Sequence, residues 1–213
     1  MTTKGLDYSF SGGSLKPTEL RQLLNHSYLY DAKKSPASIE GFEVDRSLSG
    51  KRAQVYRNPA TGQVVVAHRG TAGLHDWITD LRLVTTGTAR GTARFKHADK
   101  IQKQAEAKYG SDNVTTIGHS LGAQLATDTG SKSREIITLN KPVLPLDTAT
   151  GQHANQWNVR TQNDPVSFLD RYRANQPRER NIVIPSRSRS LLTEHRSDVL
   201  GRLSPDLEIG RKR

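Results

Sequence analysis

The sequence predicts an α/β fold in which helices cover a mixed sheet, and two observations indicate it. Short, β-branched strands joined by tight turns occupy the region around residues 42–68, a pattern typical of an antiparallel meander. From Val114 onward, strands alternate with a helix, which is typical of a layered sheet with parallel strands. The chain has 213 residues, enough for one domain with a sizeable core.

The expected elements follow from periodicity and turn signals. Residues 1–16 are rich in Ser, Gly and Thr, and we expect a flexible segment ahead of a single catalytic domain over residues 17–213. Pro17 opens a helical pattern over residues 17–32, with its leucines on one face. The other expected helices are 72–83, 95–109 and 121–127, and the expected strands are 42–48, 53–57, 63–68, 114–117, 135–139, 157–161 and 182–184.

Composition narrows the chemistry. The chain has no cysteine, which excludes disulfides, thiolate zinc sites and a cysteine nucleophile. No apolar run reaches the length of about 18 residues that a membrane span needs, and the N-terminus has no apolar signal-peptide core. We therefore expect a cytoplasmic location or delivery by a non-standard route.

The positive charge is the strongest compositional feature. The formal net charge is +11, from 32 Lys and Arg against 21 Asp and Glu, and basic residues gather in the stretches 88–103 and 171–189. A field of this sign attracts polyanions. Three interpretations stay open: a solvated surface that aids solubility, attraction to anionic membranes, and, less favoured, nucleic-acid binding.

The segment TTIGHSLGAQLA, residues 115–126, places Ser120 in a G-x-S-x-G pattern between an expected strand and an expected helix. A serine hydroxyl becomes a nucleophile when a histidine takes its proton and a carboxylate orients that histidine. The strand-to-helix context therefore favours a nucleophile over an ordinary turn. His119 lies beside Ser120, and a packing role is favoured for it over that of a base.

The order Ser, acid, His, which this kind of elbow requires, selects the partners of Ser120. Asp164 directly follows an expected strand and precedes a proline, whereas its rival Asp147 has no strand before it. The other rival, Asp170, precedes a basic run and is expected at the surface. With Asp164 as the acid, His195 is the base, because His153 precedes Asp164 in the chain and would break the order.

Two backbone N–H groups are candidates for an oxyanion hole. Leu121 begins the expected helix after Ser120, and Thr71 follows the expected strand 63–68 in Arg-Gly-Thr. Such donors stabilise the negative charge that develops on a carbonyl oxygen under attack. For Thr71, an ordinary strand-to-helix turn is the alternative.

Four ordered segments, HRGT, DWITDL, GHSLGA and TQNDPV, followed by a late histidine, resemble the class 3 (fungal-type) lipases. The resemblance implies an α/β-hydrolase-type three-layer fold, with a mostly parallel sheet, an antiparallel N-terminal meander and helices on both faces. It also implies the site residues: nucleophile Ser120, acid Asp164, base His195, and oxyanion donors Thr71 and Leu121. The sequence departs from the family at three positions, which are His68, Asn140 and Lys141.

The resemblance adds two further expectations. In the family the segment around Trp77 can act as a lid, a role open to Leu74, Trp77 and Ile78, with a fixed amphipathic helix as the alternative. The basic stretch between acid and base is expected to rim the site and attract anionic lipid, through Arg171, Arg173, Arg178 and Arg180.

The expected function is therefore a serine ester hydrolase that acts on acyl lipids, of triacylglycerol lipase or phospholipase A1-like type. It requires no cofactor or metal, since the sequence has no cluster with metal-ligand spacing. Two alternatives stay open: a non-lipid esterase or thioesterase, and an inactive lipase-like scaffold whose basic surface binds nucleic acid or an acidic partner. The lipid head group, acyl length and oligomeric state are not fixed by the sequence.

Overall fold

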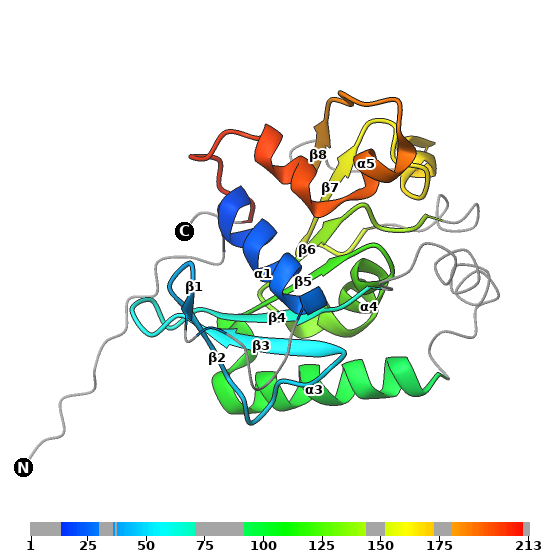
Figure 1. Cartoon of the computed structure of the whole chain (residues 1–213). Helices are drawn as coiled ribbons and strands as arrows, with labels where there is room; N and C mark the ends of the chain where they lie inside the picture. Colours follow the sequence, from blue (N-terminus) through cyan, green and yellow to red (C-terminus); the bar gives the residue numbers. More distant parts are fainter. Residues whose placement is uncertain are drawn as a thin grey trace, which may run out of the picture.

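An eight-stranded mixed sheet lies at the centre of the computed structural model, which describes residues 14–29, 36, 38–70, 92–143, 152–172 and 180–210. The strands lie side by side in chain order (Figure 1). They are β1 (Ser38–Ile39), β2 (Phe42–Val44), β3 (Ala53–Arg57), β4 (Val64–His68), β5 (Val114–His119), β6 (Glu135–Leu139), β7 (Gln156–Thr161) and β8 (Asn181–Ile184). Strands β1 to β4 pair antiparallel, and β4 to β8 pair parallel. The predicted α/β fold class, with its meander leading into a parallel sheet, is confirmed.

In the part of the chain that the structure describes, four α-helices and several short 3₁₀ turns surround this sheet. The α-helices are α1 (Pro17–Leu29), α3 (Ala93–Tyr109), α4 (Leu121–Thr129) and α5 (Leu191–His195). The 3₁₀ turns are η2 (Ser111–Asn113), η3 (Gly130–Lys132), η5 (Phe168–Tyr172) and η7 (Ser197–Arg202). Within the described ranges, no helix is long and apolar enough to cross a membrane.

The central strands are buried on both faces, which explains their composition. β4 reads VVVAH and β5 reads VTTIGH, and every residue of both strands is buried. Near-continuous runs of β-branched residues are typical of parallel strands that are covered on each side. Their register places the carboxyl ends of neighbouring strands at one edge, with His68 beside Gly118 and His119 beside Leu139.

Helices α3 and α4 cover one face of the sheet (Figure 1). Both lie on the same face because right-handed crossovers between parallel strands in sequential order place their helices on one side. Ile101 and Ala105 of α3 pack against the apolar side chains of β3, β4 and the start of β5.

The other face is covered by the two ends of the described chain. Leu20, Leu23 and Leu24 of α1 pack in a core with residues of η7 and with the opposite side chains of the sheet. Leu15 and Ile209 form an antiparallel bridge, with N–O distances of 2.8 and 2.9 Å. The sheet is thus enclosed between α3 and α4 on one side and α1 with η7 on the other.

Several predicted boundaries are confirmed, and others need correction. Strands 53–57 and 135–139 have the predicted limits, and α3 ends before Gly110, whose φ of 84° favours glycine. The strand predicted over 42–48 ends at Val44, because the side chain of Asp45 accepts the N–H of Ser47 at 2.9 Å and turns the chain. Residues 1–13 of the expected flexible segment 1–16 lie outside the described residues, and so does the expected helix 72–83.

Candidate active site

Ser120 occupies a sharp elbow between β5 and α4. Its φ of 57° and ψ of −129° lie in a region that non-glycine residues rarely adopt. The side chain is 2% exposed, and its Oγ makes no hydrogen bond to any described residue. Strain at a buried, unbonded hydroxyl is typical of a functional position rather than an ordinary turn.

The glycines two residues before and after Ser120 allow this elbow to pack. A Cβ on Gly118 would lie 2.2 Å from the carbonyl oxygen of Gly122, and a Cβ on Gly122 would lie 2.1 Å from the carbonyl oxygen of His68. The first of these backbone atoms belongs to α4 and the second to β4, so neither can move without displacing an element packed at the centre of the fold. The G-x-S-x-G pattern is therefore a packing requirement that lets α4 begin directly against β4 and β5.

Asp164 and His195 form a buried pair at the same edge of the sheet. The Oδ1 of Asp164 lies 2.5 Å from the Nδ1 of His195, and the Asp164 side chain is fully buried. The other oxygen, Oδ2, accepts the N–H and the hydroxyl of Ser167 at 2.7 and 2.6 Å. These bonds fix the carboxylate, so that it orients the imidazole through Nδ1 and directs Nε2 away from itself.

The structure brings the predicted serine, acid and base to one edge, because each follows the carboxyl end of a parallel strand. Ser120 follows β5, Asp164 follows β7, and His195 ends α5 beyond β8. The Nε2 of His195 is buried. The acid–base half of the site is assembled, while the Oγ of Ser120 has no hydrogen bond to His195. Hydrogen bonds to a nucleophile are often long in ligand-free sites and tighten with substrate.

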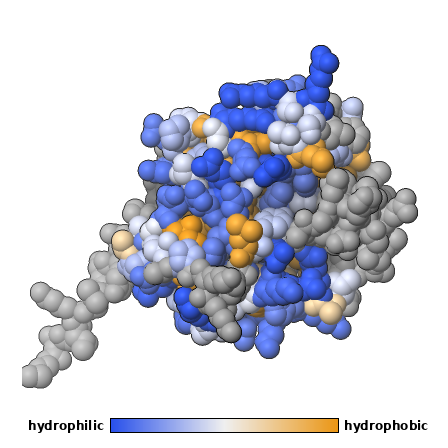
Figure 2. All heavy atoms as spheres, viewed as in Figure 1, coloured by the Kyte–Doolittle hydropathy of each residue, from blue (hydrophilic) through white to orange (hydrophobic). Residues whose placement is uncertain are grey.

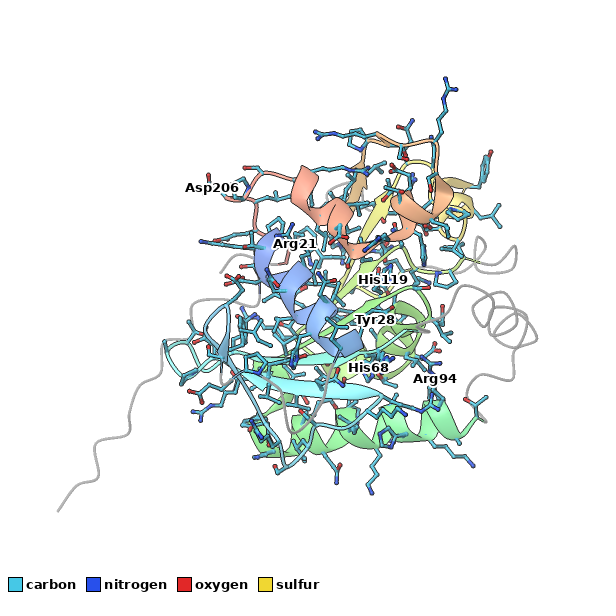
Figure 3. The ribbon with its side chains drawn as sticks, in the orientation of Figure 1. Arg21, Tyr28, His68, Arg94, His119 and Asp206 are labelled. Carbon is cyan, nitrogen blue, oxygen red and sulfur yellow. The ribbon has the colours of Figure 1, made fainter. Side chains whose placement is uncertain are left out.

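His119 holds the backbone of the base. Its Nε2 lies 2.6 Å from the carbonyl oxygen of His195, and its Nδ1 lies 3.0 Å from the hydroxyl of Tyr28. Burial, with the nearby imidazole of His195, lowers the pKa of His119 to about 3, and burial raises the pKa of Tyr28 to about 12. Tyr28 therefore donates to Nδ1 and neutral His119 donates to the carbonyl. Figure 3 shows Tyr28 beside His119, above His68.

Asn140 connects the acid-bearing strand to the base-bearing helix. This residue is fully buried with a φ of 47°, and its Oδ1 accepts the N–H of Thr161 at 2.9 Å. Its Nδ2 lies 3.1 Å from the carbonyl oxygen of Glu194 and 3.2 Å from that of His195. The sequence marked Asn140 as a departure from the lipase pattern but did not predict this contact. An Asn directly after a buried strand is the only local signal.

A buried ion pair fixes the helix that carries His195. The carboxylate of Glu194 is fully buried and lies 2.7 and 3.0 Å from two nitrogens of Arg202. The Arg202 hydrogen bonds hold the pKa of Glu194 at about 2. The backbone N–H groups of Arg187 and Ser188 also donate to this carboxylate, at 3.2 and 2.8 Å. The loop before α5 and the turn after it are thereby joined.

The segment that leads to Thr71 lies against the elbow. A Cβ on Gly70 would lie 2.7 Å from the carbonyl oxygen of His119 and 2.2 Å from the Tyr28 hydroxyl. Arg94, at the start of α3, donates to the carbonyl of Arg69 at 2.8 Å (Figure 3). Leu121 begins α4, so its N–H belongs to the first turn, which has no intrahelical partner. Gly70 and Leu121 thus both lie beside the elbow, and Thr71 itself lies outside the described residues.

Other predicted residues lie elsewhere or outside the described part. Asp170, expected at the surface, lies in the η5 turn and is only 3% exposed. Arg180, expected at the rim, precedes the amino end of β8, so it lies at the edge of the sheet opposite to the catalytic candidates. Outside the description are Thr71, Leu74, Trp77, Ile78, Asp147, Arg173, Arg178 and the side chain of Arg171. Among the described residues, no group of three or more His, Asp or Glu side chains could hold a metal ion.

Comparison with known protein families shows to which family the chain belongs. Residues 14–175 match the model of the Tle-like phospholipase domain. The chain belongs to this family. At the level of the family, this Tle-like domain is therefore of the lipid ester hydrolase type, and the predicted relationship to lipases is confirmed.

Solved lipase structures are similar to this Tle-like domain in fold. A deletion mutant of Rhizomucor miehei lipase in its propeptide complex has a TM-score of 0.50 at 14% identity, over 77% of this chain and 67% of that chain. Lip2 lipase from Yarrowia lipolytica scores 0.49 at 15% identity, with 82% of each chain covered. A triacylglycerol lipase from Penicillium expansum scores 0.46 at 14% identity, over 79% of this chain and 77% of that chain. None of the curated proteins compared with the chain matches it in sequence.

Proposed function

We propose that this Tle-like domain is a serine hydrolase that cleaves the carboxylic esters of phospholipids. One observation carries the proposal: Ser120 lies on a strained elbow with a buried Oγ that bonds to no described residue, at the same sheet edge as the hydrogen-bonded pair of Asp164 and His195. The family description favours phospholipid over triacylglycerol as the lipid class.

The proposed reaction assigns one role to each side chain. The Nε2 of His195 takes the proton of the Ser120 hydroxyl as Oγ attacks the ester carbonyl, and Asp164 stabilises the imidazolium that forms. The backbone N–H of Leu121, with that of Thr71 as the second proposed donor, stabilises the negative charge on the tetrahedral oxygen. His195 then gives its proton to the leaving alcohol. Water then attacks the acyl ester as His195 takes its proton, and His195 returns that proton to the Oγ of Ser120 as the fatty acid leaves.

The local structure supports this assignment because it holds the base in one orientation. Asp164 binds Nδ1, while His119 and Asn140 both donate to the carbonyl oxygen of His195. Because hydrogen bonds hold both the backbone carbonyl and the Nδ1 of His195, its Nε2 can point in only a small range of directions. Preorganisation of this kind avoids reorganising the site during the reaction.

The decisive experiment is covalent labelling of the serine. A fluorophosphonate probe is expected to label the wild-type chain, and Ser120→Ala is expected to abolish labelling. Ser133→Ala is the matched control, because Ser133 is another buried serine and bonds to Thr116 and Gln102 on the face toward α3 and α4. Asp164→Asn is expected to slow labelling by about 10⁴-fold, as in other serine triads. Labelling that persists in Ser120→Ala would refute the nucleophile assignment.

Substrate comparison tests the lipid class. Fatty acid release is measured from phosphatidylglycerol vesicles, a triacylglycerol emulsion, a soluble short-chain ester and an acyl thioester. The proposal predicts the highest kcat/KM on the phospholipid. Preference for the soluble ester or the thioester would show a non-lipid esterase or thioesterase. If none of the four substrates is hydrolysed and the probe does not label the chain, the domain is an inactive scaffold.

A further inference from the structure

We propose that the segment between β8 and α5 docks on an anionic phospholipid surface. The docking surface consists of Arg187, Arg189 and Leu192. The inference rests on the proposed function and adds where the lipid substrate is met: at the helix that ends in His195. The sequence predicted a cationic rim from the arginines between acid and base, residues 171–189, and the strand directions place Arg187 and Arg189 of this stretch at the catalytic edge.

The backbone of this segment is fixed from several sides. The N–H groups of Arg187 and Ser188 donate to the buried carboxylate of Glu194, and the hydroxyl of Ser186 accepts the N–H of Asn163 at 3.0 Å. The hydroxyl of Ser190 caps α5 by accepting the N–H of Thr193. A loop that is already ordered loses little conformational freedom when its side chains bind a partner.

The charge of the docking surface is positive and uncompensated. The side chains of Arg187 and Arg189 belong to exposed residues, and neither forms an ion pair with a described residue. The nearest acidic residue in sequence, Glu194, is fully buried and bound to Arg202. Two exposed guanidinium groups attract anionic head groups, and each changes partitioning onto such a surface by about fivefold.

An exposed apolar side chain accompanies these charges. Leu192 is 50% exposed, and it precedes His195 by three residues in α5. Residues three apart on a helix are neighbours on its surface, so Leu192 lies on the side of α5 that carries the base. Figure 2 shows apolar residues beside strongly hydrophilic ones in the region of β8 and α5. Basic residues beside an exposed apolar side chain suit the boundary between head groups and acyl chains.

The combination favours a membrane over a nucleic acid. Phosphate backbones are bound by charge and hydrogen bonds, and they give no reason to expose a leucine beside the arginines. The second basic surface, on α3, lacks this combination: Lys96, Lys100 and Lys103 are exposed, and Lys103 pairs with Asp99 at 2.8 Å. Since α3 packs on β3 to β5 while α5 lies beyond β8, the α3 lysines form a matched control of equal charge on a distant face (Figure 1).

The test measures vesicle binding in a chain that cannot hydrolyse lipid. Ser120→Ala protein is sedimented with phosphatidylcholine vesicles and with vesicles that also contain phosphatidylglycerol, at low and at high salt. Adding Arg187→Ser with Arg189→Ser is expected to lower partitioning onto the anionic vesicles by about 30-fold. The double control Lys96→Ser with Lys100→Ser removes the same charge and is expected to change binding by less than about threefold. Leu192→Ser is expected to weaken binding, whereas Leu29→Ser, at another exposed leucine, is not.

Each alternative outcome has a definite meaning. Equal losses for the two double variants would show that net charge alone drives binding, and would overturn the docking surface. Binding of duplex DNA that depends on Arg187 and Arg189, without binding to anionic vesicles, would replace the membrane with a nucleic acid. The docking variants on the Ser120-containing chain keep full fluorophosphonate labelling if the proposed function holds, so failure of docking and failure of the nucleophile are told apart.

Discussion

Acidification from pH 7 to pH 5.5 is expected to destabilise the fold through two buried histidines. His68 is fully buried, bonded to Gln102 at 3.3 Å and Thr129 at 3.2 Å, and its burial lowers its pKa to about 4. His119 has a pKa of about 3 for the reasons given above. Both remain neutral in the folded chain, whereas in the unfolded chain they bind protons below their ordinary value of 6.5. Stability is therefore present above pH 6.5 and is lost as the pH falls below it.

The magnitude follows from proton linkage. Each pH unit between the unfolded and the folded pKa changes the free energy of unfolding by about 1.4 kcal/mol per group. From pH 7 to pH 5.5, which is above both folded pKa values, each histidine removes about 1.3 kcal/mol, and the pair removes about 2.5 kcal/mol. Burial also lowers the pKa of His26, which acts in the same direction. A loss of this size is a large part of the 5–15 kcal/mol typical of a domain.

The assay measures urea unfolding at the two pH values, with circular dichroism as the signal. His68→Gln and His119→Gln each remove one titrating group and are expected to reduce the acid-dependent loss by about 1.3 kcal/mol. His153→Gln is the matched control, because His153 is exposed. For each variant we compare the free energy of unfolding at pH 7 with that at pH 5.5. A packing defect that lowers the free energy equally at both pH values cancels in this difference. An unchanged pH dependence in both His68→Gln and His119→Gln would refute the reasoning.

Three further substitutions, with Asn158→Ala as a control for the first, test the site and its supports. Asn140→Gly keeps the left-handed backbone but removes the bonds to His195, and is expected to lower kcat on a soluble ester by about tenfold or more with little change in KM. Asn158→Ala, at a buried amide bonded to Thr138, is expected to reduce stability in urea without that fall in kcat. Gly122→Ala forces a Cβ against a backbone oxygen and is expected to prevent soluble expression, whereas normal expression and labelling would contradict the elbow packing. Arg202→Met leaves the Glu194 carboxylate buried without its cation, and is expected to reduce the free energy of unfolding by about 3–5 kcal/mol, measured in urea.

The parts of the site that the sequence predicted are those whose cause is local. Ser120 and its flanking glycines meet within a few residues, because the strand, the turn and the helix follow one another directly. Asp164 could also be predicted, since a residue at the end of a buried strand places its side chain at the catalytic edge. Patterns of this kind are read along the chain without knowing the topology.

The supports of the base were not predicted, because they join residues far apart in sequence. Asn140 and His195 are 55 positions apart, and only the pairing of β6 with β7 beside α5 brings them together. One residue of the expected basic rim, Arg180, was misplaced for a related reason. Arg180 and Arg187 both lie between the acid and the base in sequence, but the direction of β8 places them at opposite edges of the sheet.

The closure of the sheet by α1 and η7 has a consequence for how the molecule folds. The strands add in chain order, but the face beneath α1 is completed only when residues near Ile209 reach Leu15, across almost the whole described sequence. Contacts between such distant residues slow folding, because a long loop must close before they form. The elbow of Ser120 is built from strands β4 to β6, which are close in sequence, whereas His195 is held next to η7, which packs against α1 at the other end of the described chain. The nucleophile and its base therefore depend on contacts of very different sequence separation.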